Sequence, residues 1–159
     1  MHLSRRSLLV AAALPVGAGA LAACGNDTPA PEPVAVRPSA SEAPEENLLD
    51  EFALIGAYLG AIEEFPELRG TCSALADQHR AHARELGASE EQLAAIEPIA
   101  PSAVRRGPVI TELVSRERAA ADMRADSALR AESPERVRTL TFICASETSH
   151  IPELRDLRS

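Results

Sequence analysis

The chain has 159 residues, of which 45% are hydrophobic and 3% aromatic, and its formal net charge at pH 7 is −8. All of its basic side chains except histidine are arginines, since it contains no lysine. An acidic chain with few aromatic residues lacks the positively charged surface that binds nucleic acid, so nucleic acid is not an expected partner. The length fits one domain of ordinary size with a shorter leading segment.

Residues 1–23 have the pattern of an export signal. Arg5 and Arg6 give it a positive start, and the apolar run over residues 8–20 is too short and too rich in Gly and Ala for a membrane span. The stretch SRRSLL over residues 4–9 is similar to a twin-arginine signal. Arginine pairs also occur in ordinary export signals, so both the twin-arginine route and the general secretory (Sec) route stay open.

Residues 21–24 read LAAC, the pattern of a lipobox, at which bacterial lipoprotein precursors are lipidated on the cysteine and cleaved before it. We therefore predict a lipoprotein that is anchored through acyl chains such as palmitate on Cys24. Two acyl chains meet the requirement for stable attachment to a bilayer. The predicted partner is thus the lipid bilayer, and the predicted location is the extracytoplasmic face of the cell membrane.

The mature chain is expected to begin with a lipidated cysteine and a tether over residues 24–44. Residues 25–44, GNDTPAPEPVAVRPSASEAP, are dominated by Pro, Ala, Ser and Glu and show no apolar period. Such a composition is typical of a disordered, extended linker. The folded domain is then predicted over residues 45–159.

Within that domain the apolar residues recur with helical rather than strand periodicity. We expect long helices over residues 45–64, 66–87, 108–131 and from 134 onward, with a short helix before Pro98. The signals for helix starts are Pro66, a capping box of Ser89 with Gln92, and Ser133 followed by Pro134, and the signal for a helix end is Gly87. Short connections inside the first and last pairs of helices and a longer one between the pairs predict an all-α four-helix bundle.

Polar residues interrupt the apolar stripes of three of these helices. The interrupting residues are His79 and His82 in the second long helix, Glu117 in the third, and Glu147 and His150 in the fourth. The first helix has its expected stripe at Leu48, Phe52, Ile55, Leu59 and Ile62, which places Glu51 and Glu63 at the edges. Burying an unpaired carboxylate is costly, so Glu117 and Glu147 need partners if they lie inside.

The spacing of these residues indicates a metal site. Carboxylate-bridged metal sites in helical bundles take one Glu from each of two helices and a Glu-x-x-His pair from each of the others. Glu117 with Glu147-x-x-His150 supplies half of such a set, and His79-x-x-His82 stands where the second pair would be. The first helix offers no central carboxylate. Oxygen and imidazole donors suit iron, manganese or zinc, so these five residues are candidate ligands for one of those metals.

Three stretches carry a resemblance to a known family: GAYLGAIEEFPELRGTCSALADQHRAHARELG, SRERAAADMRAD and LTFICASETSH. Their order and spacing resemble those of ferritin-like lipoproteins of bacteria, most of which have no known function. The resemblance covers about residues 48–157 and implies a ferritin-like fold for the bundle, in which the short helix before Pro98 lies between the second and third long helices. It implies metal ligation only where ligands match, at Glu117, Glu147 and His150. The departures on the first two helices argue against a di-iron oxidase.

Two interpretations of the polar residues are open. In one they form a structural network, in which Glu147 and His150 pair with each other or with the histidines of the second helix. Arg116 or Arg124 would then neutralise Glu117. In the other interpretation the residues bind a metal ion.

The predicted function follows from the first interpretation: a binding or interaction role in the cell envelope, without catalysis. The alternative function is metal binding or metal-dependent redox chemistry. Tyr58 is expected in the core with its hydroxyl at the rim. Cys72 and Cys144 are expected as two buried free thiols, because antiparallel helices would place them too far apart for a disulfide.

Overall fold

The computed structural model describes residues 44–158, and the predicted signal, Cys24 and most of the tether lie outside them. The described chain is all-helical and has no strand, which confirms the predicted all-α class. Its elements are α1 (Pro44–Glu64), a 3-10 turn (Pro66–Leu68), α2 (Arg69–Glu85), α3 (Glu90–Ala94), α4 (Arg106–Arg130) and α5 (Pro134–Asp156). No helix in this part of the chain is long and apolar enough to cross a membrane.

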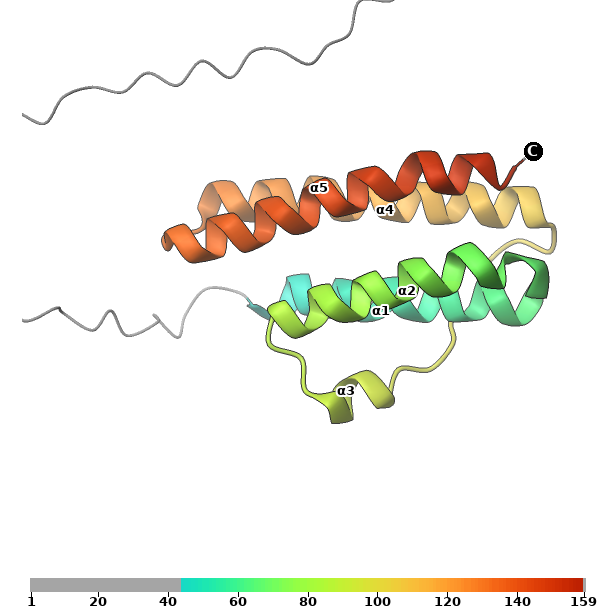
Figure 1. The fold of residues 1–159 in the computed structure, drawn as a ribbon, viewed down its shortest axis with the longest axis horizontal. Coiled ribbons are helices and arrows are strands. Elements are labelled where there is room, and N and C mark those ends of the chain that lie inside the picture. The colour runs from blue at the N-terminus through green and yellow to red at the C-terminus, as the bar shows by residue number, and fades with distance from the viewer. Residues whose placement is uncertain (1–43, 159) are drawn as a thin grey trace, which may run out of the picture. The chain divides into compact units, whose positions relative to one another are not determined.

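The four long helices form a bundle of two hairpins (Figure 1). Helix α1 packs mainly against α2, and α4 packs mainly against α5. The hairpins meet where α1 contacts α4 and α2 contacts α5. The connection that carries α3 returns the chain along the bundle, so that α2 and α4 run in the same direction and every adjacent pair is antiparallel (Figure 1). A helical bundle with a short extra helix is therefore observed, while its kinship with ferritin-like proteins stays a prediction.

Local signals mark the starts and ends of the helices largely where the sequence predicts them. Ser89 and Gln92 form a complete capping box at the start of α3. The hydroxyl of Ser133 accepts a hydrogen bond from a backbone N–H in the first turn of α5. Gly87 has a positive φ of 102°, which favours glycine at the end of α2. Pro66 differs from the prediction, because it opens the 3-10 turn before α2 rather than α2 itself.

Helix α1 buries two neighbouring stripes instead of the single stripe expected. The second stripe is Asn47, Glu51, Leu54, Tyr58 and Ala61, all of them buried. It faces the bundle interior, whereas Leu48, Phe52 and Leu59 of the predicted stripe are partly buried against the cluster that contains Leu93 of α3. The prediction that Glu51 lies at the edge of the core is therefore wrong, because α1 is covered from two sides.

The two thiols are free, as predicted, although only one of them is buried. Cys72 lies in the core of α2, and Cys144 on α5 is partly exposed. Cys72 lies in the first turn of α2, whereas Cys144 lies near the middle of α5.

The connection between α3 and α4 lies directly on α1. The N–H of Ile99 donates to the carbonyl oxygen of Gly56 at 2.8 Å. A Cβ atom placed on Gly60 would lie 1.8 Å from the Ile99 carbonyl oxygen and 2.5 Å from its carbon. Glycine at position 60 is therefore needed for the close approach of two backbones.

We predict that Gly60→Ala lowers the free energy of unfolding by about 1–3 kcal/mol, because the new methyl group forces the connection away from α1. Gly70→Ala on α2 is the matched control, since a Cβ there meets nothing within 4 Å. The control should be neutral or slightly stabilising, because alanine favours helix over glycine. Urea unfolding of both variants measures the difference, and an equal effect at the two positions would contradict the observed packing.

Candidate metal centre

The five predicted ligands come together in the interior of the bundle. His79, Glu117, Glu147 and His150 are 0% exposed and His82 is 5% exposed. Glu51 of α1, also 0% exposed, joins them, so that all four long helices contribute.

These side chains form two groups of candidate metal ligands that share His79. The first group is Glu51, His79, His82 and Glu147, and the second is His79, Glu117 and His150. Within each group the ligand atoms lie within 4.8 Å of one another. The buried cluster of glutamates and histidines could therefore hold a metal ion.

The second group is already satisfied by hydrogen bonds within the protein. Both oxygens of Glu117 accept: Oε1 from the Tyr58 hydroxyl and from His79 Nε2 at 2.9 Å, and Oε2 from His150 Nδ1 at 3.2 Å. The other ring nitrogen of His150 lies 3.0 Å from Gln78 Oε1. Tyr58 is 0% exposed, so its hydroxyl lies inside the centre and not at the rim as predicted.

The first group, in contrast, leaves polar atoms without partners. His79 Nδ1 lies 2.8 Å from Glu51 Oε2, which satisfies that pair. His82 Nδ1 is 3.8 Å from Glu51 Oε1, and neither it nor either oxygen of Glu147 has a hydrogen-bond partner among the described residues. A buried polar atom left unpaired costs about 1–3 kcal/mol. Two imidazoles and two carboxylates, of which His82 and Glu147 have unused donor atoms, fit a first-row divalent metal ion.

Arg124 of α4 supplies a buried positive charge beside this group. It is 0% exposed, and its Nη2 lies 2.9 Å from Asp50 Oδ2 and 3.1 Å from Glu51 Oε1. The same nitrogen is 3.5 Å from Glu147 Oε1, a distance typical of an ion pair. Arg124 therefore neutralises carboxylates of α1 and α5.

The structural pairings expected from the sequence are replaced by others. Glu117 is held by Tyr58 and two histidines, and Arg116 pairs with Glu112 at 2.8 Å near the surface. Neither arginine therefore plays the predicted part of neutralising Glu117. Glu147 also makes no hydrogen bond to the histidines, which was the other expected pairing.

The environment shifts the pKa values of the buried groups in opposite directions. Burial opposes the charge on His79, but its hydrogen bonds with Glu117 and Glu51 outweigh burial and raise its pKa to about 9. Burial also raises the pKa values of Glu51 and Glu117, yet the hydrogen bonds from histidine prevail and lower both to about 2. Burial raises the pKa of Glu147 to about 8, because Arg124 offsets only part of the cost.

These shifts describe a centre whose charge is balanced by protons when no metal is bound. At neutral pH, His79 and Arg124 are positive, Glu51 and Glu117 are negative, and Glu147 is protonated. Burial and the adjacent Glu117 raise the pKa of Tyr58 well above its usual value, so its hydroxyl keeps its proton and donates.

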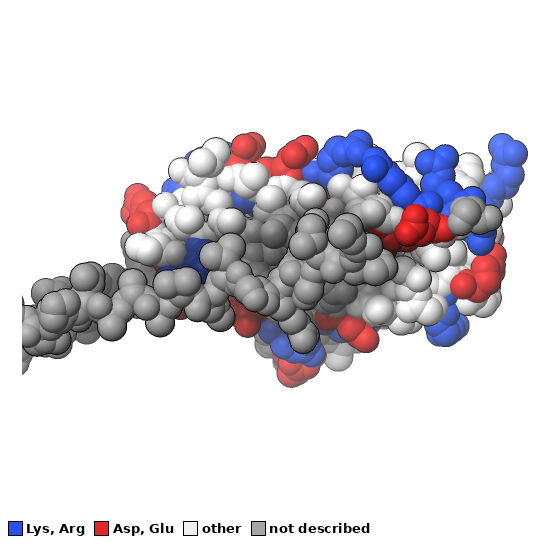
Figure 2. Space-filling view, turned by 45° about the horizontal axis from the view of Figure 1, so that its top comes forward, with Lys and Arg blue, Asp and Glu red and all other residues white. Residues whose placement is uncertain are grey.

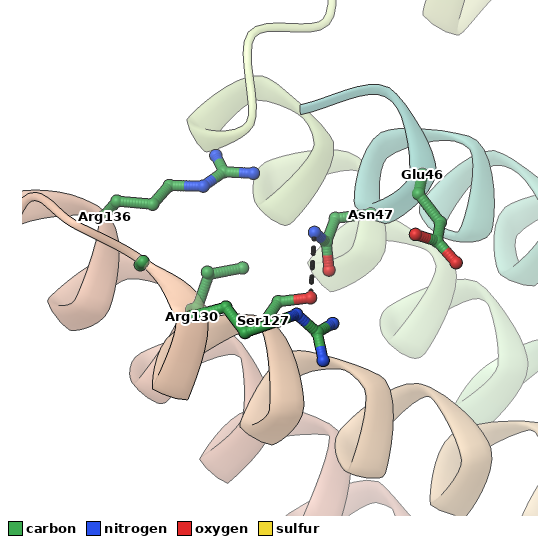
Figure 3. Close-up of a pocket in the computed structure, with 7 residues that line it drawn as sticks. Glu46, Asn47, Ser127, Arg130 and Arg136 are labelled. Carbon is green, nitrogen blue, oxygen red and sulfur yellow. Dashed lines mark hydrogen bonds between the residues drawn. The ribbon is translucent and has the colours of Figure 1, made fainter. Parts of the chain in front are cut away.

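A pocket of about 190 Å³ lies near the end of the bundle where α1 begins and α4 ends. In Figure 3, Asn47 Nδ2 donates to Ser127 Oγ, at 3.3 Å, between the guanidinium groups of Arg130 and Arg136. Asn47 Oδ1 accepts from Arg124 Nη1 at 3.2 Å. Arg124 thus contacts a pocket-lining residue with one nitrogen and the candidate ligands with the other.

The candidate ligands themselves do not reach the surface. The acidic and basic side chains that Figure 2 shows on the visible face, where the two signs are mixed, are therefore different residues from those of the centre.

Sequence reasoning missed Glu51 and the part played by Arg124. A signal for Glu51 exists in the sequence. The stripe Asn47, Glu51, Leu54, Tyr58 and Ala61 has the same alternating spacing of four and three as the predicted stripe that begins at Leu48. Arg124 lies seven residues after Glu117, which places both on one face of α4.

No protein-family model, curated protein or solved structure matches this chain. The resemblance to ferritin-like lipoproteins therefore stays a prediction from the sequence, and the candidate centre rests on its own geometry.

We predict that the protein in the presence of a chelator loses stability as the pH rises from about 6 to 9. The pKa of His79 is raised in the fold, so its contribution is complete below pH 6.5 and is lost as the pH rises through about 9. The pKa of Glu147 is also raised, so its contribution is lost between pH 4.5 and about 8, in the same direction.

Urea unfolding at about pH 6 and about pH 9 should show that the free energy of unfolding is lower at the higher pH by on the order of 2 kcal/mol. Glu147→Gln should reduce the loss, because glutamine does not ionise. Stability that rises with pH over this range would contradict the described charge balance.

Proposed function

We propose that this domain binds a divalent transition-metal ion, iron, manganese or zinc, through Glu51, His79, His82 and Glu147. One observation carries the proposal: His82 Nδ1 and both oxygens of Glu147 are buried without hydrogen-bond partners and belong to one group of close ligand atoms. A metal ion would use these atoms, and Arg124 would then orient two of the ligating carboxylates from outside.

Holding the ion is favoured over turning over a substrate. Four side chains are available as ligands, and sites that only hold a metal typically have four protein ligands, whereas catalytic sites keep one coordination position open. We therefore propose a non-catalytic, metal-binding role.

We further propose that the domain performs this role at the cell membrane. The support is the LAAC pattern at residues 21–24, preceded by a positive segment and an apolar run. Together these proposals make the protein a lipid-anchored, metal-binding component of the cell envelope, with a ferritin-like bundle as its binding domain.

We predict that the untagged, exported protein contains iron, manganese or zinc and that the metal raises its thermal stability. At a free metal concentration a hundred times the dissociation constant the gain is about 2.7 kcal/mol. Glu147→Gln should remove the bound metal and the gain together, while Glu112→Gln, at the surface pair with Arg116, should change neither. Elemental analysis and thermal unfolding with and without chelator provide the measurements.

Absence of metal, together with an unfolding temperature that does not respond to added metal, would refute the proposal. The buried residues would then be a structural polar network, and an envelope protein partner would become the subject of the search.

We predict that Cys24→Ala releases the protein from the membrane, because the residue that would carry the acyl chains is lost. Cys144→Ala is the matched control, since this partly exposed thiol lies in the helical domain. Fractionation of cells that express each variant, with detection of the protein in the membrane and soluble fractions, tests the anchor. Membrane retention of the Cys24 variant would overturn it.

A further inference from the structure

Arg124 brings a fixed positive charge among three carboxylates beside the first group of candidate ligands. Its Nη2 is surrounded by carboxylate oxygens of three residues, Asp50, Glu51 and Glu147, at 2.9, 3.1 and 3.5 Å. Oxygen ligands gathered around one point are the environment of a bound cation. Here the cation is part of the chain and is itself 0% exposed.

The carboxylates around Arg124 determine how much positive charge the centre can hold. Glu51, Glu117 and Glu147 are each 0% exposed, and Asp50, whose side chain is 27% exposed, is a fourth carboxylate beside them. With all four ionised and the ligating histidines neutral, two divalent ions and the Arg124 guanidinium would leave one uncompensated positive charge, and an uncompensated buried charge is strongly unfavourable. One divalent ion with Arg124 leaves no excess positive charge, and two divalent ions without Arg124 would balance the four carboxylates.

We infer that Arg124 is a fixed cation that limits the centre to one divalent metal ion, an inference that rests on the proposed metal binding. An arginine side chain stays protonated at all physiological pH values, so the guanidinium cannot give up its charge to admit a second ion. Arg124 is thus a residue that sets stoichiometry, while the second group around Glu117 remains held by hydrogen bonds.

The test counts metal ions per chain at saturation. The full-length protein and its variants are stripped with chelator, loaded separately with Mn²⁺ and Zn²⁺, passed through gel filtration and analysed for metal and protein. Arg124→Gln removes the charge, and Arg124→Lys keeps it. Arg116→Gln is the matched control, since Arg116 lies on the same helix and pairs only near the surface, with Glu112.

The expected counts are one ion for the wild-type chain, Arg124→Lys and Arg116→Gln, and two for Arg124→Gln. A purely structural role for Arg124 would change stability without changing the count. Two ions in the wild-type chain, or one in a folded Arg124→Gln variant, would overturn the inference.

If Arg124→Gln does not fold, the wild-type count at saturation decides alone: one ion supports the inference and two overturn it. A wild-type chain that binds no ion refutes instead the metal binding on which the inference rests.

Discussion

Three carboxylates buried in the interior of one small bundle require compensation, and the arrangement of the centre follows from that requirement. An ionised carboxylate moved from water into the protein interior loses hydration worth several kcal/mol, and only nearby positive charge and hydrogen bonds recover it. Glu117 obtains these from Tyr58 and two histidines, and Glu51 obtains them from His79 and Arg124. Glu147 obtains only a longer contact with Arg124, which leaves the compensation incomplete at this one residue.

The same residues join the two halves of the bundle. The hairpin of α1 and α2 meets the hairpin of α4 and α5 through far fewer neighbouring residues than each hairpin has within itself. The polar contacts that cross this boundary include Tyr58 with Glu117 and Arg124 with Glu51. Docking of the hairpins is therefore coupled to the charge state of the centre: a change that unbalances the charges also weakens the joint between the halves. The hydrophobic effect also holds the hairpins together, since Tyr58 of α1 belongs to one core cluster with Ile110 and Leu113 of α4.

The sequence was sufficient to predict the helices and most of the cluster, because periodicity and end signals are local properties. Ser89 with Gln92, and Ser133, begin helices through contacts within one turn, so their roles can be predicted without the fold. Glu147-x-x-His150 lies on one helix face for the same reason. Whether Glu51 lies inside depends on how many neighbours cover α1, which is a tertiary property.

The partners of charged residues were likewise beyond the sequence. The spacing of seven from Glu117 places Arg124 on the inner face of α4, but Arg124 lies 73 positions from Glu51, and no local pattern predicts that these two residues meet. In the structure the two arginines of α4 differ in burial. The Arg124 guanidinium is enclosed among carboxylates, whereas that of Arg116 lies near the surface beside Glu112. Thus the residue types of the centre were predictable, whereas the division of its charges required the packing of all four helices.

Burial of the ligands also determines how an ion can reach or leave them. Each proposed ligand is almost completely enclosed, and a hydrogen bond from Arg124 to Asn47 connects the centre with a pocket at one end of the bundle. Exchange of an ion therefore requires part of the bundle to open, and the boundary between the hairpins is the least extensively packed part of it. Opening there would separate Glu51 and His82 of the first hairpin from Glu147 of the second, and so would break up the proposed set of ligands. A centre built in this way is suited to retaining an ion once the domain has folded around it, which agrees with a holding role more closely than with rapid exchange.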